Sequence, residues 1–438
     1  MSPKQLNESS PLATWLEEIE ACHPAEIELG LDRMRQVAER LPIDLNESFK
    51  IIIGGTNGKG TSVRLLETIL LEAGYSVGTY TSPHFVHYNE RICLSGMPVD
   101  DSLICAAFTQ IEAQREDIPL TYFEFGTLAA LLIFAEQKPD FLLLEVGLGG
   151  RLDSVNLVDG DVSLVTTIAL DHTEWLGPDR ESIGFEKAGI FRSARPAVCG
   201  DASPPQSLID HASNIGSPLF CQSQHFSFAK LDSDTWSWQG VDKDGQPVSI
   251  SDLPMPRLPL QNASSVLQVL QLIPVTPSLQ HIRQGLQKAQ LMGRMQPGIL
   301  SGFPCILDVA HNPESAAYLA NHLADLLVIH PQQKNHLVLG MLADKDMVQV
   351  CELLLPVVEH WHLVTLDTPR GASSSKLKAI LDSLGVPPSS VAEYDNVKIA
   401  LLQLPQLMDP AARVVIAGSF FTVTDALSIV ERADGEQG

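Results

Sequence analysis

A glycine-rich turn between an apolar strand and a helix constrains the fold of this chain most strongly. Residues 49–53 form a short apolar run of the β type, and Gly-Gly-Thr-Asn-Gly-Lys-Gly-Thr follows at 54–61. Apolar residues then recur at helical spacing over 63–73, which predicts a helix. Such a turn places backbone N–H groups, a lysine and hydroxyls at a helix start, where phosphate oxygens bind well. We therefore predict a nucleotide-phosphate loop, although Gly60 separates Lys59 from the hydroxyl residues and departs from the usual spacing of such loops.

The chain around this turn alternates strands and helices. Further buried strands are predicted at 76–81, 141–146 and 163–168, with a helix over 124–137. This alternation predicts an α/β fold, with a parallel sheet covered by helices on both faces. Aromatic residues at period two and an Asp-Gly turn signal indicate a small antiparallel insert within about 200–260.

A second α/β domain is predicted in the C-terminal part of the chain. Helices at 262–273 and 277–291 close the first domain, residues 1–292, and the Gly and Pro residues of 293–297 indicate a linker. The domain over 298–438 is expected to be Rossmann-like. Its strands are predicted at 305–309, 336–340, 362–366 and 413–417, and its helices at 314–327, 373–384 and 422–432.

Composition excludes several classes of protein. The 438 residues carry 29 basic and 53 acidic side chains, a net charge of −24, which argues against diffuse binding to nucleic acid or to an anionic membrane. Seven widely spaced cysteines without a C-x-x-C pair are expected to be reduced, buried thiols. No apolar run reaches the length of about 18 residues that a membrane span needs. We expect a cytoplasmic protein.

Polar side chains end several of the predicted strands. Glu145 ends one strand, Asp171-His172 follows the next along the chain, and Ser82 follows the strand at 76–81. The carboxyl ends of parallel strands are where ligands bind in open α/β sheets, so these residues are candidate Mg²⁺ ligands beside the phosphate loop. A histidine is an unusual ligand for Mg²⁺, and taken singly Glu145 or His172 could equally be a satisfied polar residue.

Other candidates are ambiguous when each is taken alone. Lys187 lies on an amphipathic helix, where a solvated surface lysine is the commoner case, and Arg294 lies in the linker, where an exposed arginine is the commoner case. Asp308 and His311 follow an apolar strand, again at a carboxyl end.

Seven motifs together resemble a known family. They occur in order over most of the chain: G-T-N-G-K-G-T-S, T-S-P-H with E-R-I after it, T-Y-F-E-F, E-V-G-L-G-G-R-L-D, A-L-D-H-T, E-K-A-G-I-F-R and D-V-A-H-N-P. This series closely resembles the bacterial bifunctional dihydrofolate synthases/folylpolyglutamate synthases, which are relatives of the Mur ligases.

The resemblance implies a Mg²⁺- and ATP-dependent amide ligase, with two magnesium ions and an active site in the cleft between its domains. Such an enzyme adds L-glutamate to 7,8-dihydropteroate and to reduced folates through an acyl phosphate. It implies small-molecule substrates, a monomer, and no nucleic-acid or membrane partner. Phosphoryl transfer of this kind needs positioning and charge neutralisation more than a protein nucleophile, which suits the cations and loops found here.

The resemblance also implies roles for individual residues. Catalytic roles fall on Lys59, His172 and Lys187, with Lys187 carrying a carbamate whose oxygens bind Mg²⁺. The metal positions are Ser82, Glu145, His172 and Lys187. The ATP positions are Gly58, Lys59, Gly60, Thr61, Asn262, Arg294 and Asp308. The substrate positions are Glu28, Leu29, Thr121, Tyr122, Phe123, Glu124, Arg151, Asp153, Ser154 and His311.

Two positions depart from the family pattern, and other functions remain open. Ser154 stands where Ala or Thr is expected, and Phe421 where His is expected. A folylpolyglutamate synthase without the first activity is the nearest alternative, although T-Y-F-E-F favours the bifunctional enzyme. A Mur-type cell-wall ligase normally carries a further N-terminal domain, whereas 48 residues precede the first strand here. A regulatory P-loop NTPase would leave the second domain unexplained.

Overall fold

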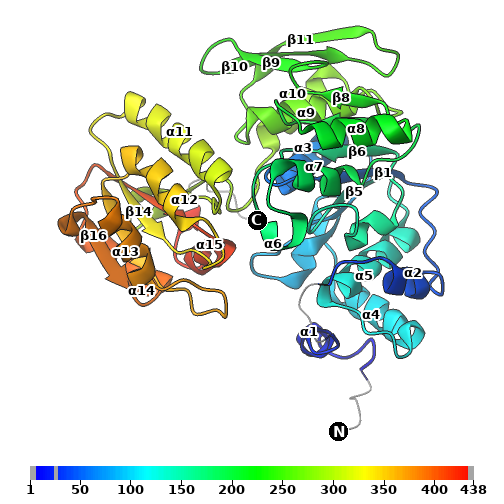
Figure 1. Ribbon diagram of the computed structural model, residues 1–438, viewed down its shortest axis with the longest axis horizontal. Helices are drawn as coiled ribbons and strands as arrows, with labels where there is room; N and C mark the ends of the chain where they lie inside the picture. Colours follow the sequence, from blue (N-terminus) through cyan, green and yellow to red (C-terminus); the bar gives the residue numbers. More distant parts are fainter. Residues whose placement is uncertain (1–5, 24–27, 433–438) are drawn as a thin grey trace. The chain divides into compact units, whose positions relative to one another are not determined.

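The computed structural model describes residues 6–23 and 28–432, and the chain divides into two compact units, residues 1–289 and 290–438 (Figure 1). Each unit is an α/β domain built on its own sheet, as predicted.

The first unit contains an eight-stranded sheet in the order β4-β3-β2-β5-β1-β6-β7-β8. The six strands from β2 to β8 in this order are parallel, and β3 and β4 extend the sheet as antiparallel strands. The phosphate-loop strand β1 is therefore central, between β5 and β6. The strands are β1 (Phe49–Gly54), β2 (Val77–Tyr80), β3 (Ile92–Leu94), β4 (Met97–Pro98), β5 (Phe141–Glu145), β6 (Val162–Val165), β7 (Ala197–Cys199) and β8 (Leu219–Cys221).

Helices cover both faces of this sheet because its central strands are apolar on both sides. Ile52, Leu142 and Leu144 pack in one core with residues of α1, α4 and α5, whereas α3 packs with α9 and α10 (Figure 1). The helices are α1 (Leu12–Glu20), α2 (Asp32–Ala38), α3 (Lys59–Glu72), α4 (Asp101–Arg115), α5 (Tyr122–Gln137), α6 (Thr173–Leu176), α7 (Arg180–Ala188), α8 (Gln206–Ile215), α9 (Leu260–Leu270) and α10 (Leu279–Lys288), with the 3₁₀ turns η1 (Tyr88–Arg91) and η2 (Ser154–Leu157).

The antiparallel insert is shorter than the sequence indicated. Its three strands, in the order β11-β10-β9, are β9 (Ser227–Lys230), β10 (Thr235–Val241) and β11 (Pro247–Pro254). Residues before them form α8 and β8, and β8 joins the main sheet as a parallel strand. The period-two tryptophans identified the insert correctly: Trp236 and Trp238 are buried, and the Trp238 indole donates to the carbonyl of Ser264 in α9 at 3.0 Å.

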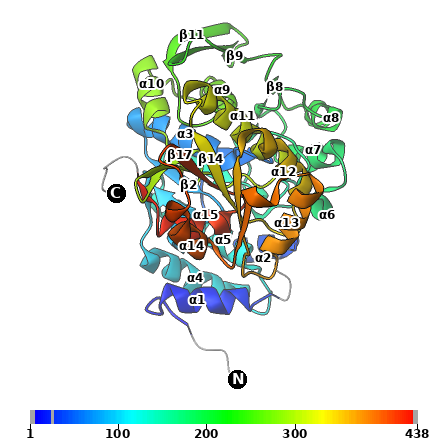
Figure 2. The ribbon, with the colours of Figure 1, turned by 90° about the vertical axis from the view of Figure 1, so that its left-hand side faces the viewer.

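The second unit contains a seven-stranded sheet in the order β16-β15-β14-β17-β13-β12-β18. The strands from β16 to β13 are parallel, whereas β12 pairs antiparallel with β13 and β18. Its strands are β12 (Gln296–Leu300), β13 (Phe303–Leu307), β14 (Lys334–Leu339), β15 (His360–Val364), β16 (Val391–Tyr394), β17 (Ala412–Ala417) and β18 (Glu431–Arg432). Its helices are α11 (Pro313–Ile329), α12 (Met347–Leu354), α13 (Ser374–Ser383), α14 (Val397–Gln403) and α15 (Phe420–Leu427) (Figure 2).

The predicted linker over 293–297 overlaps strand β12. That strand begins at Gln296, and Pro297 is paired with Ile306 in the antiparallel ladder. Proline and glycine are typical of turns, so the sequence pattern predicted a linker up to Pro297. In the structure Pro297 and Gly298 are both part of strand β12.

Within residues 6–23 and 28–432, no helix has the length and apolar character needed to cross a membrane.

Candidate active site

The phosphate loop joins β1 to α3 and contains two glycines that the packing requires. Gly58 has φ of 86°, and a Cβ atom there would lie 2.2 Å from the Asn262 amide nitrogen. A Cβ at Gly55 would lie 1.9 Å from the Thr166 hydroxyl. The Lys59 ammonium donates to the carbonyls of Gly55 at 3.1 Å and Thr56 at 3.2 Å, so the lysine lies folded over the loop. Gly60 and Thr61 form the first turn of α3, where the helix dipole favours an anion.

Two other segments of the first unit hold this loop in place. After β6 the chain continues beside the loop: the Thr56 N–H donates to the Thr167 carbonyl at 2.8 Å, and the Thr166 hydroxyl donates to the Asn57 carbonyl at 2.6 Å. From α9, the buried Asn262 amide donates to the Gly58 carbonyl at 3.2 Å. Asn262 thus contacts the phosphate loop directly.

Ser82 and Glu145 lie together beside the loop. Strand β5 pairs with both β2 and β1, so the ends of these strands are neighbours. The Ser82 N–H donates to Glu145 Oε2 at 3.3 Å, and the Glu145 side chain is buried. A hydroxyl and a carboxylate are the oxygen ligands that Mg²⁺ prefers, so this pair fits the metal.

His172 follows β6 with a strained backbone. Its φ of 51° lies in the left-handed region, and Nε2 lies 4.0 Å from Asp171 Oδ1. Residues with such backbone conformations are concentrated at functional sites. Among the residues that the structure describes, no group of three or more His, Cys, Asp or Glu side chains is arranged to hold a metal ion.

Lys187 is buried, and the surface alternative for this residue is wrong. Lys187 lies on α7, and only 3% of the residue's surface is exposed. The loop after β5 packs closely against the backbone of Glu186 in α7, because a Cβ atom at Gly150 would lie only 2.6 Å from the Glu186 carbonyl oxygen. Arg151 reinforces the contact: its backbone N–H donates to the Glu186 carbonyl and its guanidinium to the Glu186 carboxylate, both at 2.8 Å.

Asp153 is a buried carboxyl group at the end of the same loop. It accepts from the N–H groups of Leu148 at 2.8 Å and Val155 at 2.9 Å, and Ser154 beside it is also buried. Burial raises the pKa of Asp153 to about 6, although these N–H groups and the Lys59 charge act to lower it. The site therefore holds a carboxyl group that changes charge just below neutral pH.

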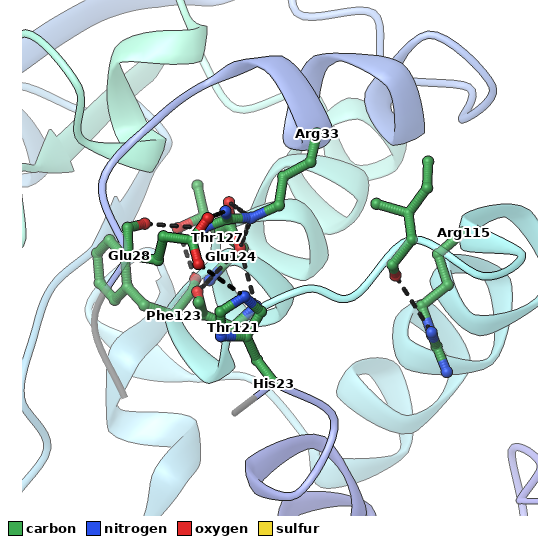
Figure 3. Close-up of polar contacts among 9 residues, drawn as sticks. His23, Glu28, Arg33, Arg115, Thr121, Phe123, Glu124 and Thr127 are labelled. Atoms are coloured by element: carbon green, nitrogen blue, oxygen red, sulfur yellow. Dashed lines mark hydrogen bonds and ion pairs between the residues drawn. The ribbon is translucent and has the colours of Figure 1, made fainter. Parts of the chain in front are cut away.

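A buried ion-pair network organises the start of α5 (Figure 3). Glu124 is 1% exposed and accepts from the Thr121 N–H at 2.8 Å in a capping box. Both Glu124 oxygens also accept from Arg33 Nε, at 2.9 and 3.0 Å. The Arg33 guanidinium also forms an ion pair with the Glu28 carboxylate. An oxygen of that carboxylate lies 3.1 Å from His23 Nε2. No local sequence pattern pointed to Arg33, because only the fold brings it to Glu124.

The network also positions Leu29. Gly30, the next residue, donates its N–H to the Leu152 carbonyl at 3.2 Å. The segment at 28–33 is thereby tied both to α5 and to the loop that carries Arg151 and Asp153. These predicted substrate residues therefore lie in one region of the first unit.

Aromatic rings occupy the neighbouring positions. Phe123 lies 5.9 Å from Tyr80 between ring centroids, and a Cβ at Gly147 would lie 2.6 Å from the Phe123 ring. Tyr122 meets Tyr88 edge to face at 5.6 Å. Tyr80, Tyr88 and the nearby Arg91 were not predicted as site residues.

The second unit gathers three predicted residues at the end of β13. Buried Asp308 accepts from the N–H groups of Met295 at 2.9 Å and Ala310 at 2.8 Å. Burial raises the pKa of Asp308, while the charge of nearby Arg294 acts to lower it. Arg294 lies over the Phe420 ring, 5.2 Å from its centroid, and His311 Nδ1 lies 2.8 Å from the Val309 carbonyl oxygen. Phe421 is exposed.

Comparisons with known proteins agree on one family over 97% of the chain. The Mur ligase, glutamate ligase domain family matches residues 293–420. The dihydrofolate synthase/folylpolyglutamate synthase of Escherichia coli strain K12 is 43% identical over 425 residues, which cover 97% of this chain and 96% of that protein. The structure of E. coli FolC in complex with DHPP and ADP has a TM-score of 0.89 at 40% identity, covering 97% of this chain and 98% of that one. A bifunctional folylpolyglutamate synthase/dihydrofolate synthase with Mn, AMPPNP and L-glutamate bound has a TM-score of 0.88 at 44% identity, covering 97% and 99%.

The ion pair of Arg33 with Glu124 should contribute strongly to stability. Arg33→Ala should lower the free energy of unfolding by about 3 kcal/mol or more, because it leaves the buried Glu124 carboxylate without its cation. Chemical denaturation measures this change. Arg35→Ala is the matched control on the same helix, since Arg35 pairs with Asp32 at 3.7 Å on the surface and its loss should matter little. Equal effects of the two substitutions would contradict the assignment.

Asp153 should titrate in the free protein near pH 6. Carboxyl-carbon NMR of aspartate-labelled protein measures this midpoint. Since Lys59 acts to lower the pKa of Asp153, Lys59→Met should raise the midpoint further. Because the folded-state pKa of Asp153 exceeds its ordinary 3.8, ionising it costs stability above pH 6, and this cost should fall as the pH drops from 6 towards 3.8. Asp232, whose carboxylate accepts exposed N–H groups that lower its pKa, is the control and should titrate below 3.8.

Proposed function

The chain belongs to the dihydrofolate synthase/folylpolyglutamate synthase family, and from this premise we infer how its residues carry out the reaction of these ATP-dependent ligases. It adds L-glutamate to 7,8-dihydropteroate, forming dihydrofolate, and to reduced folates, forming polyglutamates. The observation that carries this function is the 43% identity to a bifunctional relative over 97% of the chain.

The reaction proceeds in two steps, in which one anhydride forms and is then consumed. A carboxylate oxygen of the acceptor attacks the γ-phosphorus of ATP, which releases ADP and leaves an acyl phosphate. The amino group of glutamate then attacks the acyl carbon, phosphate leaves, and an amide forms. Because the reacting groups carry the chemistry, the protein has to position them, neutralise charge and exclude water.

The phosphate loop supplies the cation and the N–H groups for this transfer. The Lys59 ammonium is hydrogen-bonded to two loop carbonyls at the N-terminus of α3. A phosphate bound there would therefore lie next to a positioned positive charge. Gly58, Gly60 and Thr61 complete the ATP-phosphate site that we propose. Asn262 in the first unit, and Arg294 and Asp308 in the second, are the further ATP residues, and His311 serves the ATP or glutamate side.

Ser82, Glu145, His172 and a carbamate on Lys187 would hold magnesium in this site. The contact of Ser82 with the buried Glu145 supports the first two, and the burial of Lys187 supports the last. When bound, the ions neutralise phosphate charge. We propose two such ions; a relative has been solved with Mn bound.

The pterin acceptor is held by the region around the start of α5. The rings of Tyr122 and Phe123 offer apolar faces, and the Asp153 carboxyl offers a buried hydrogen-bonding group. Because the oxygens of Glu124 already accept from Thr121 and Arg33, we assign Glu124 to holding this region in shape. The remaining acceptor residues in the proposal are Glu28, Leu29, Thr121, Arg151 and Ser154.

The substrates are small molecules, and we propose that the protein acts as a cytoplasmic monomer without nucleic-acid or membrane partners. The net charge of −24 supports the absence of nucleic acid. The seven cysteines are all free thiols, which supports a reducing compartment.

The activity is tested by product analysis with both acceptors. Purified protein is incubated with ATP, Mg²⁺ and L-glutamate, and either dihydropteroate or tetrahydrofolate, and the products are measured by mass. The expected result is ADP together with dihydrofolate in the first case and polyglutamates in the second. Extension of folate alone would reduce the function to folylpolyglutamate synthesis, and ATP turnover independent of both acceptors would contradict the ligase assignment.

Lys187 should be needed for activity as a carbamate. Lys187→Ala should lower kcat by at least about a hundredfold, because it removes a metal ligand, and a small carboxylic acid should restore part of the rate. Lys138→Ala is the control, since Lys138 is an exposed residue paired with Glu47. An unmodified lysine in the mass of the intact protein and in a magnesium-bound crystal structure would refute the carbamate.

A further inference from the structure

Arg91 ends the turn η1 and lies beside the segment that carries Ser82. Its carbonyl accepts from the Thr81 N–H at 2.9 Å, so the two segments run next to each other. The guanidinium carbon lies 5.3 Å from the Tyr88 ring centroid and 5.5 Å from that of Tyr122. Arg91 is therefore next to both the proposed metal residues and the proposed acceptor residues.

Three contacts hold the Arg91 side chain in this place. Besides the two tyrosine rings, its Nε donates to His84 Nδ1 at 2.8 Å. Because Nδ1 accepts this bond, the proton of the neutral His84 ring is on Nε2. The guanidinium is thus fixed before any ligand arrives.

No acidic side chain pairs with Arg91 in the part of the chain that the structure describes. Glu90 is next to it in sequence, but its carboxylate accepts the N–H groups of Phe85 at 2.7 Å, Val86 at 2.9 Å and His87 at 2.6 Å. Acidic residues outnumber basic ones by 53 to 29 in this chain, so a half-buried arginine without an acidic partner is unexpected.

The free edge of this guanidinium suits a carboxylate. With Nε engaged by His84, the Nη1 and Nη2 atoms have no partner among the described residues. Two N–H groups on these atoms match the two oxygens of a carboxylate in a bidentate pair. The acceptors always carry such a group: dihydropteroate has its benzoate carboxylate, and a folate has the α-carboxylate of its terminal glutamate next to the reacting γ-carboxylate.

We propose that Arg91 binds a carboxylate of the acceptor and thereby selects acceptors that carry one, with His84 as the residue that positions its guanidinium. This inference rests on the proposed function, since it assumes that the acceptor lies against Tyr122.

The test compares acceptor binding to wild-type protein and to Arg91→Gln, in the presence of Mg²⁺ and AMPPNP. The ligands are dihydropteroate, tetrahydrofolate and the carboxamide of dihydropteroate, and binding is followed by fluorescence. Losing a charge-assisted bidentate pair should weaken binding of a carboxylate ligand about ten- to hundredfold. Binding of the carboxamide should stay the same. Arg91→Lys should recover part of the affinity, because it keeps the charge without the planar fork.

Arg115→Gln is the matched control. Arg115 also lies over an aromatic ring, that of Phe125 at 5.9 Å, but it is paired with Glu112 at 2.6 Å away from the proposed acceptor residues (Figure 3). Its loss should not change acceptor binding. The thermal midpoint of each variant checks that the fold is intact.

The outcomes separate the two carboxylate sources and the two hypotheses. A loss of affinity for dihydropteroate alone identifies its benzoate carboxylate as the ligand of Arg91, and a loss for tetrahydrofolate alone identifies a carboxylate of its glutamate. A loss for both shows that Arg91 binds a carboxylate of either acceptor. Unchanged affinity for both, or an equal loss for the carboxamide, would overturn the role of Arg91. Wild-type protein that makes neither dihydrofolate nor polyglutamate would refute the proposed function instead.

Discussion

The packing of two other segments against the phosphate loop is the constraint on which the first unit depends. The loop after β1 lies against the chain that continues from β6 and against Asn262 of α9, with hydrogen bonds to both. A side chain at Gly55 or Gly58 would collide with Thr166 or Asn262. The glycines thus serve two purposes, since they leave the loop N–H groups open to phosphate and let the supporting segments pack against it.

Polar groups buried near the proposed acceptor region give it a fixed shape. Arg33 and Glu124 join the segment before α2 to the start of α5, and Glu90 ties the turn at 85–87 to itself through three N–H groups. These carboxylates accept several hydrogen bonds from the protein itself. Arg91 and Asp153 differ from them: one has no acidic partner among the described residues, and the other is protonated more readily than an ordinary aspartate.

The sheet order decides which polar residues meet. Ser82, the phosphate loop and Glu145 come from chain segments far apart in sequence, yet the adjacent strands β2, β5 and β1 end side by side. Parallel strands place all their carboxyl ends at one edge, so a single sheet gathers the cation, the hydroxyl and the carboxylate that phosphoryl transfer needs.

The sequence by itself determined the two α/β domains, the phosphate loop and the residues of the family motifs, because strand and helix periodicity and glycine placement are local properties of the chain. It missed β16, α12 and α14, and it extended the antiparallel insert over a segment that forms α8 and β8. The start of β12 was not predicted, because proline and glycine favour turns and only the pairing with β13 places Pro297 and Gly298 in a strand. Only the tertiary structure decided that Lys187 is buried, that Arg33 neutralises Glu124 and that Arg91 has no acidic partner within the described ranges. These properties depend on contacts between residues distant in sequence, and no local pattern specifies which side chains such contacts bring together.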